Sequence, residues 1–126
     1  MIIGKVNADY EPIIPIAICD RQGKLHERDA VIDTGFDGWL CLPPDLIAEL
    51  QLNWKRRGRA LLADGSESIF DIYEATVVWD GQFLTIPIDE AECDPLVGML
   101  LMKGYELKIQ VINGGIVKLM KLPIQS

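Results

Sequence analysis

One acidic residue stands where a carboxylate could carry out chemistry: Asp33, directly after the apolar run 30–32. It opens the tripeptide Asp33-Thr34-Gly35, and a second apolar run follows at 39–42. Gly35 sits in this turn as a residue that adopts backbone angles other residues resist. A carboxylate held in such a turn can act as a general base or a general acid toward a bound substrate. The alternative is that Asp33 only stabilises the turn through hydrogen bonds.

The number of such acids decides which reaction is open to the chain. A single carboxylate is a poor catalyst of amide hydrolysis, but two that share one proton can divide the work. The ionised one activates water and the protonated one donates to the carbonyl oxygen. The sequence contains one Asp-Thr/Ser-Gly tripeptide, at Asp33. A pair therefore requires a second copy of the chain, with a twofold axis between the two Asp33 residues.

The elements that must hold this turn are short strands, to judge from the spacing of apolar residues. Leu84, Ile86 and Ile88 alternate with other residues, as in a half-buried strand. Asp-Gly and Asn-Gly pairs separate many of the runs and favour hairpin turns. We predict an all-β barrel or sandwich. The predicted strands are 2–6, 13–19, 25–33, 39–42, 59–63, 68–79, 84–88, 107–111 and 116–122.

Four strands carry more specific predictions. The run 13–19 is almost continuously apolar, which indicates a strand buried on both faces. Within 68–79 the apolar residues change phase near Tyr73, which predicts a bulge or a bend. The terminal strands 2–6 and 116–122 are expected to be sheet edges that need covering.

One or two short helices are predicted beside the strands. Pro44 favours a helix start, and Leu46, Ile47 and Leu50 fall on one helical face. Residues 99–103 have room for about one more helical turn before a glycine.

Composition and charge narrow the class of protein. The 126 residues fit one domain, which we place at 1–126, and 49% apolar content supplies an ordinary core. A net charge of −7 argues against binding nucleic acid phosphates or acidic membranes. No apolar run approaches the ~18 residues of a membrane span, and residues 1–10 lack the pattern of a signal peptide. We expect a cytoplasmic protein.

Metal and cofactor sites are not predicted. Cys19, Cys41 and Cys93 are widely spaced and form no Cys-x-x-Cys pair or Cys/His cluster. We interpret them as reduced thiols without a disulfide framework. The acidic run 89–94 lacks the residue spacing of a calcium loop. No Ser or Cys in the context of a catalytic nucleophile accompanies His26.

The order of these segments resembles that of the retropepsin-like aspartic proteases. In that family an Asp-Thr/Ser-Gly loop precedes a flap hairpin and a later apolar-apolar-Gly segment, which match 33–35, 63–66 and 96–98 here. Because Phe36 follows the tripeptide, the chain is similar to small single-domain prokaryotic members. The resemblance covers roughly 12–122. It implies a closed acid-protease barrel with one lobe per chain.

The resemblance also implies roles for residues. Asp33 would be the catalytic carboxylate, supported by Thr34 and Gly35, and residues 96–98 would pack beside this loop. The implied substrate-binding residues are Asp37, Gly38, Ala63, Asp64, Gly65, Leu96, Val97 and Gly98. The implied activity is that of an aspartic endopeptidase without metal or cofactor, acting on peptides or proteins as a homodimer. Neither nucleic acid nor membrane is an implied partner.

A second interpretation is a peptide-binding or dimerisation module of the same fold that does not cleave. Two departures from the family pattern motivate it. Phe36 stands where a small residue commonly follows the tripeptide, and Met99 stands where many retroviral members carry an arginine. For residues 37 and 38, the alternative to substrate binding is that they only form a turn.

Overall fold

The computed structural model describes residues 1–123, which contain ten strands and one helix. The strands are β1 (Ile2–Val6), β2 (Pro12–Cys19), β3 (Leu25–Ile32), β4 (Leu40–Leu42), β5 (Asn53–Leu61), β6 (Glu67–Trp79), β7 (Gln82–Glu90), β8 (Leu96–Val97), β9 (Tyr105–Ile109) and β10 (Ile116–Lys121). The helix is α1 (Pro44–Leu50). The predicted all-β class is confirmed. None of the helices within 1–123 is long and apolar enough to span a membrane.

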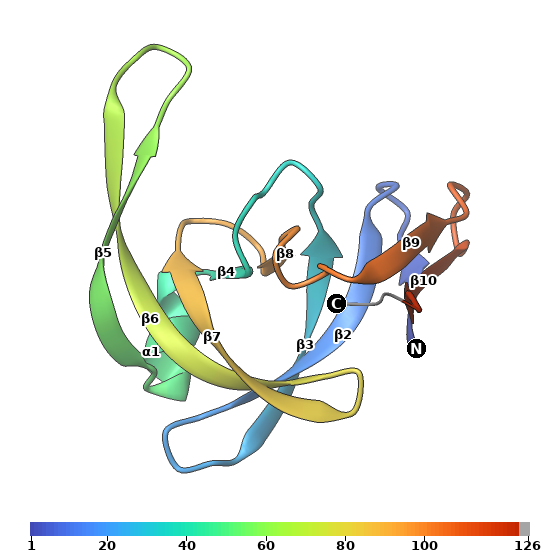
Figure 1. The fold of residues 1–126 in the computed structure, drawn as a ribbon, viewed down its shortest axis with the longest axis horizontal. Helices are drawn as coiled ribbons and strands as arrows, with labels where there is room; N and C mark the ends of the chain where they lie inside the picture. The colour runs from blue at the N-terminus through green and yellow to red at the C-terminus, as the bar shows by residue number, and fades with distance from the viewer. Residues whose placement is uncertain (124–126) are drawn as a thin grey trace.

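The strands form a closed barrel with an extension at each end (Figure 1). Their order is β5-β6-β7-β4-β8-β3-β2-β1-β10-β9, and an added pairing of β2 with β6 closes the ring. This closure is antiparallel and joins Ala17 to Val78 and Ile18 to Val77. The closed barrel expected from the resemblance is therefore present, and it sets the position of every loop described below.

The interior of the barrel explains why the strands alternate. Ile14, Ile16 and Ile18 of β2 are buried, whereas Pro15 between them is exposed. The prediction that this strand is buried on both faces is wrong, because a barrel strand has only one face toward the interior. The core also includes Ala30, Ile32, Leu40, Leu42, Val77, Ile86, Ile88 and Val97.

Strand β6 changes its inward face along its length, as the sequence predicted. Ile72 is buried in one phase and Ala75 and Val77 in the other. The bulge lies in the neighbouring strand, where the β5–β6 register slips between Trp54 and Arg56, while β6 pairs with β7 without interruption. Beyond this point the outer part of the β5–β6 hairpin, residues 57–71, leaves the barrel as the arm seen in Figure 1.

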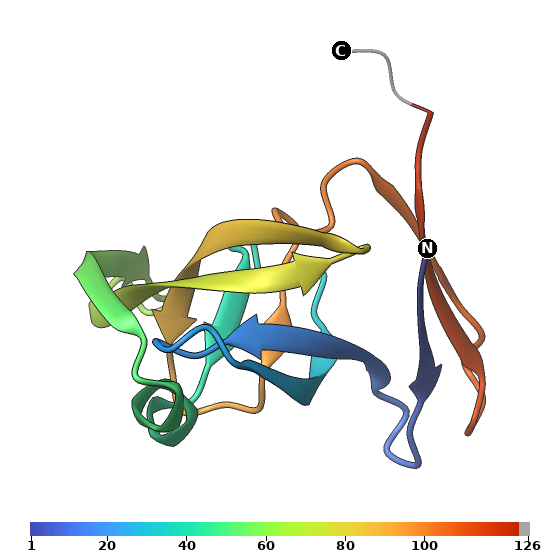
Figure 2. The same cartoon turned by 90° about the horizontal axis from the view of Figure 1, so that it is seen from below.

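At the other end of the sheet, β1, β10 and β9 form the terminal sheet, which stands beside the barrel in Figure 2. Its register pairs Ile2 with Leu119 and Leu119 with Leu107, so these side chains share the inward face. The expectation that β1 and β10 are sheet edges is wrong. Each lies between two strands, and in the described sheet the outer strands are β5 and β9.

The two predicted helices have different outcomes. Helix α1 forms, and Leu46, Ile47 and Leu50 are its buried residues. The second segment, residues 99–104, is a series of turns rather than a helix. One helix-like bond joins the Met102 N–H to the Gly98 carbonyl at 3.4 Å. Gly104 then adopts a φ of 87°, a left-handed conformation that ends the coil.

Tyr105 joins the terminal sheet to the barrel. Its ring packs edge-to-face on Trp79 with centroids 6.0 Å apart, and its hydroxyl donates a hydrogen bond of 2.9 Å to Asp80. Burial and the hydrogen bond to Asp80 raise the pKa of Tyr105 to about 12. The neutral phenol is therefore the form that this contact between the two parts of the fold requires.

Alkaline conditions should weaken this contact. An unfolded tyrosine ionises near pH ~10, so the unfolded chain holds fewer protons than the folded one between pH ~10 and ~12. The stability from Tyr105 is thus complete below pH ~10 and is lost as pH rises through the folded value. We expect the urea midpoint to fall between pH 9 and pH 11 by less in Tyr105→Phe than in the unmodified chain. An equal fall in both proteins would contradict this assignment.

Candidate active site

Asp33 lies directly after β3, at the start of the Asp33 loop, residues 33–39. The buried strand residues Ala30 and Ile32 fix where the loop begins. The Asp33 side chain accepts a hydrogen bond of 2.9 Å from the Gly35 N–H, and its carbonyl accepts one of 3.1 Å from the Phe36 N–H. Asp33 is half-buried and Thr34 is exposed. The carboxylate is therefore held by its own turn and still reaches solvent.

The segment around β8 clamps the loop from below. β8 pairs in parallel with β3 and antiparallel with β4, the strands on either side of the loop. The Asp33 N–H donates to the Val97 carbonyl at 2.9 Å, and the Gly98 N–H donates to the Trp39 carbonyl at 2.9 Å. The Leu100 N–H donates to the Gly38 carbonyl at 3.0 Å. The predicted contact of residues 96–98 with the loop is thus present, and it is made through the backbone.

Gly38 of the loop and Gly98 after β8 are needed for close approach rather than for unusual backbone angles. Neither Gly35 nor Gly38 has a positive φ, which differs from the sequence-based interpretation of Gly35. A methyl group at Gly38 would lie 2.6 Å from the Phe36 ring, and one at Gly98 would lie 2.7 Å from it. The Phe36 ring therefore covers both glycines, and this bulky residue is part of the packing of the loop.

A groove of about 890 Å³, the loop–arm groove, lies beside the Asp33 loop. Residues 35–37 line one side, residues 59–61 and 68–70 of the arm line the other, and residues 89–92 with Cys41 complete it. Of the predicted substrate-binding residues, Asp37 lies on this groove. Its lining mixes polar and apolar residues, as a site for a peptide strand would.

Asp89, at the end of β7, is a groove residue that the sequence analysis did not select. Burial raises the pKa of its carboxyl, Arg56 opposes the rise, and Asp37 adds to it. Gly38 approaches this side chain closely, since a methyl group there would lie 3.3 Å from an Asp89 oxygen. Asp89 stands in the acidic run 89–94, and nothing in the local sequence distinguishes it from the exposed residues Glu92 and Asp94 of that run.

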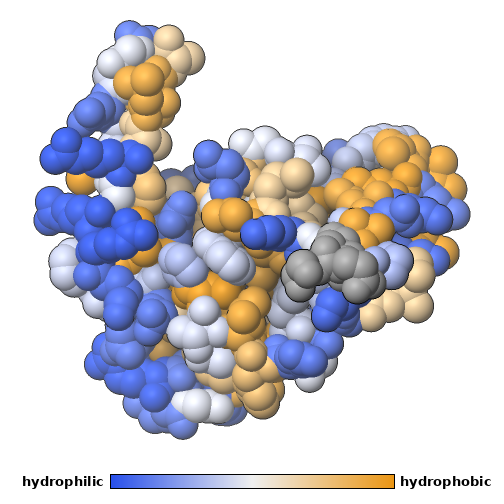
Figure 3. Space-filling view, viewed as in Figure 1, coloured by the Kyte–Doolittle hydropathy of each residue, from blue (hydrophilic) through white to orange (hydrophobic). Residues whose placement is uncertain are grey.

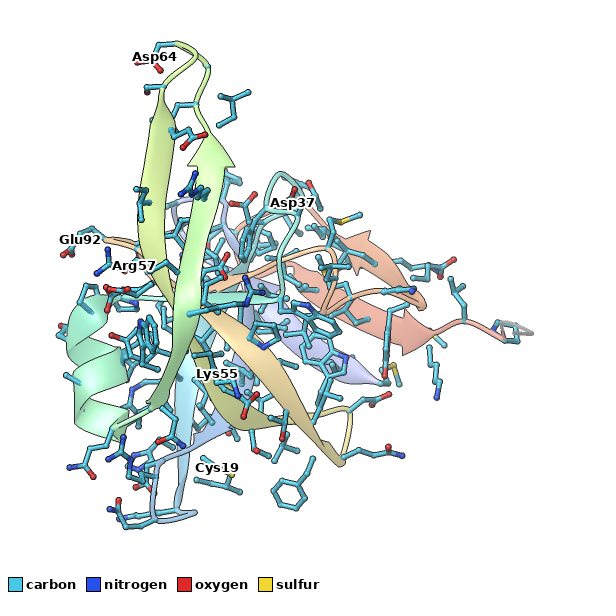
Figure 4. All side chains as sticks on the ribbon, turned by 60° about the vertical axis from the view of Figure 1, so that its left-hand side comes forward. Cys19, Asp37, Lys55, Arg57, Asp64 and Glu92 are labelled. Atoms are coloured by element: carbon cyan, nitrogen blue, oxygen red, sulfur yellow. The ribbon has the colours of Figure 1, made fainter. Side chains whose placement is uncertain are left out.

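The predicted flap residues Ala63, Asp64 and Gly65 form the hairpin tip, as expected, but they are not brought to the Asp33 loop. All three are exposed, and Figure 4 shows Asp64 at the far end of the arm, away from Asp37. The hydrogen bonds of Asp64 go to Ser66 within the tip itself. The parts of the arm that do line the groove, Ile69 and Phe70 among them, lie nearer its base.

The remaining predicted residues lie beneath the loop. Leu96 is half-buried, while Val97 and Gly98 are buried. The side chains of Leu96 and Val97 contribute to packing, and the backbones of Val97 and Gly98 make the hydrogen bonds described above. Within residues 1–123, no group of three or more His, Cys, Asp or Glu side chains is arranged to hold a metal ion.

Known proteins resemble this chain in structure and not in sequence. No protein-family model matches the sequence, and no curated protein matches it. The EIAV protease in complex with the inhibitor HBY-793 matches over 77% of this chain and 89% of its own, with a TM-score of 0.55 and 15% identity. A retropepsin-like aspartic protease from Rickettsia conorii matches over 91% and 90%, with a TM-score of 0.49 and 15% identity. The match to the EIAV protease shows that the chain has a retropepsin-like fold.

Proposed function

We propose that this chain is an aspartic endopeptidase that acts as a homodimer, with Asp33 of each copy forming the catalytic pair. The observation that carries the proposal is the placement of Asp33. Its loop is clamped through backbone hydrogen bonds to β8, and its carboxylate remains open to solvent. The next residues of the loop, 35–37, line the groove of about 890 Å³. The retropepsin-like fold supports the same conclusion.

The proposed reaction needs the two carboxylates and a water molecule. The ionised Asp33 takes a proton from the water as the oxygen attacks the scissile carbonyl carbon, and the protonated Asp33 donates its proton to the carbonyl oxygen. When the tetrahedral intermediate collapses, its hydroxyl returns that proton to the Asp33 that donated it, and the C–N bond breaks. The leaving amine takes up the proton that the other Asp33 removed from water. An extended peptide would bind in the loop–arm groove through strand-like backbone hydrogen bonds.

Exposed residues near the Asp33 loop offer a surface that a second copy of the chain would contact. Thr34 and Gly35 are exposed at its tip, and the apolar side chains of Met99 and Leu100 are 50% and 41% exposed beside it. The Met99 N–H donates to the Phe36 carbonyl at 2.9 Å, so this apolar surface is fixed to the loop. In the proposed dimer the Thr34 hydroxyl would bond to the backbone of the partner's loop.

The terminal sheet offers a further surface to the second copy. On its outer face, Ile3, Ile116 and Met120 are 49%, 49% and 40% exposed, and the register places them on one side. Figure 3 shows exposed apolar surface on this side of the molecule. An interface here would use the faces of β1 and β10, since both of their edges are already paired.

The second candidate is a retropepsin-like module that binds peptides or dimerises without cleavage. One observation favours it: the arm holds its tip away from the Asp33 loop, so the part of the chain that would close on a substrate makes no contact with the loop. A binding module needs the groove but not the pair of carboxylates.

Peptide cleavage and mass in solution distinguish the two candidates. We expect the purified chain to sediment as a dimer at micromolar concentration and to cleave members of a random peptide library between pH 4 and pH 7. Pepstatin, which imitates the tetrahedral intermediate, should inhibit the cleavage. A dimer that binds library peptides without cleaving any would favour the binding module. A monomer would exclude the catalytic pair.

A further inference from the structure

Two cysteines that are far apart in the sequence meet next to the loop–arm groove. Cys41 Sγ and Cys93 Sγ lie 3.2 Å apart, although 52 residues separate them along the chain. Both are free thiols in this structure. In the sequence, neither spacing nor neighbouring residues link the two positions, so no disulfide framework was predicted.

The topology of the barrel brings them together. Cys41 lies on β4, between β7 and β8, and pairs with Asp89 on one side and Leu96 on the other. Residues 91–95, the arch, connect β7 to β8 and therefore pass over β4, carrying Cys93 to Cys41. The Ala91 N–H donates to the Leu42 carbonyl at 3.2 Å and holds one end of the arch on β4.

We propose that Cys41 and Cys93 are a modification site: a dithiol that low-molecular-weight disulfides convert reversibly into an intramolecular disulfide. A disulfide bond is about 2.05 Å long, so the two sulfur atoms must approach by about 1 Å. Cys41 is fixed by strands on both sides, whereas Cys93 lies in a bend between exposed residues. The arch is therefore the part of the chain that must move.

The reaction is a thiol–disulfide exchange in two steps. The Cys93 thiolate attacks one sulfur of the small disulfide, which forms a mixed disulfide and releases one small thiolate that takes up a proton. Cys41, after giving its proton to the solvent, then attacks Cys93 Sγ and releases the second small thiol. The protein loses two electrons and two protons, and the small disulfide is reduced to two thiols.

The surroundings of the two thiols set the order and the rate of these steps. Cys41 is only 5% exposed and Cys93 is half-buried, so Cys93 is the thiol that a small disulfide can reach. Burial raises the pKa of both thiols, and Glu92 and Asp94 add to the rise at Cys93. Exchange should therefore be slow near neutral pH and faster in alkaline buffer, because the thiolate is the nucleophile.

The product would tie the arch to β4 where both border the groove. Cys41 and Ala91 are groove residues, so oxidation would make this wall rigid. The tie also closes a long loop in the unfolded chain, which should raise the Tm by roughly 5–10 °C. This inference does not depend on peptide cleavage, and its test uses no activity measurement.

The test is to incubate the folded chain with excess oxidised glutathione at pH 8.5, then denature it and alkylate with iodoacetamide. We expect neither Cys41 nor Cys93 to be alkylated, and we expect a peptide map that links these two residues, whether or not glutathione reacts with the half-buried Cys19. The Tm should rise, and dithiothreitol should reverse it. Three adducts, or a glutathione adduct at Cys93 with Cys41 alkylated, would overturn the proposal.

Matched variants assign the effect to this pair. Cys19→Ser should keep the full rise in Tm, because Cys19 is a half-buried thiol at the end of β2 and outside the pair. Cys93→Ser should lose the rise. If Cys93→Ser does not fold, the peptide map of the unmodified chain still decides, since a link between Cys19 and either other cysteine would overturn the proposal.

Discussion

Replacing Asp33 by asparagine is expected to lower kcat/KM for peptide hydrolysis by roughly 10³-fold or more, because an amide can neither take a proton from water nor donate one as a carboxylic acid does. The fold should be unaffected. The Asn side-chain oxygen can still accept the hydrogen bond that the Gly35 N–H donates at 2.9 Å, and Asp33 is only half-buried. Cleavage of a library-selected peptide and thermal unfolding together measure both parts of this expectation.

Asp9→Asn is the matched control for this substitution. Asp9 is an exposed turn residue outside the Asp33 loop and the loop–arm groove, so the same change there should leave both activity and Tm unaltered. Full activity in Asp33→Asn would remove Asp33 from the mechanism. A large fall in the Tm of Asp33→Asn would instead mean that its loss of activity comes from a damaged fold.

Subunit mixing extends the same substitution to the question of the dimer. If each dimer has a single catalytic pair, a random equimolar mixture of unmodified and Asp33→Asn chains contains about one quarter active dimers. If each chain works alone, about one half of the activity remains. The measurement is activity per total protein after the chains have exchanged. A result near one half would contradict a shared pair even when Asp33 itself is required.

The sequence was sufficient for the features that depend on neighbouring residues. An apolar run before Asp33 places this residue at the end of a strand, and β3 indeed ends at Ile32. Leu46, Ile47 and Leu50 recur at helical spacing, and α1 buries all three. The phase change near Tyr73 is visible because a one-residue shift moves every following side chain to the other face.

Features that depend on distant pairing could not be predicted from local pattern. Nothing near Ile2 indicates that it pairs with Leu119, which is why the terminal strands were expected to be edges. The contact of Cys41 with Cys93 likewise depends on the arch crossing β4. The position of 96–98 under the loop was expected only through the family resemblance, because a two-residue strand has no periodicity of its own.

The direction of the arm is a different kind of problem. Local sequence predicts its turn, and Gly65 takes a φ of 86° there. Its orientation would have to come from contacts between the tip and the rest of the chain, but the tip residues 62–67 are exposed and do not line the loop–arm groove. Leu61 and Leu62 are 78% and 47% exposed, so a substrate or a second chain would have apolar surface to cover there.

Gly98→Ala is expected to destabilise the chain by about 2–4 kcal/mol, because the added methyl group has no space. It would lie 2.2 Å from the Gly38 carbonyl oxygen, which is backbone and already accepts the Leu100 N–H at 3.0 Å. Relief of this clash requires β8 to separate from the Asp33 loop. The Gly98 N–H bond to Trp39 at 2.9 Å should then weaken, and the loop should lose the clamp that fixes Asp33. Urea unfolding measures the loss.

Gly35→Ala tests whether this loss comes from the clash rather than from any added methyl group in the loop. At Gly35 the nearest atom would be an Asp33 side-chain oxygen at 3.3 Å, and Gly35 is exposed without a positive φ. A side chain can yield where a clamped backbone cannot, so we expect Gly35→Ala to lose less than about 1 kcal/mol. Equal losses in the two variants would show that the loop is not held through Gly98. A large loss at Gly98 alone would mean that the contact of β8 with the Asp33 loop depends on the absence of a side chain at residue 98.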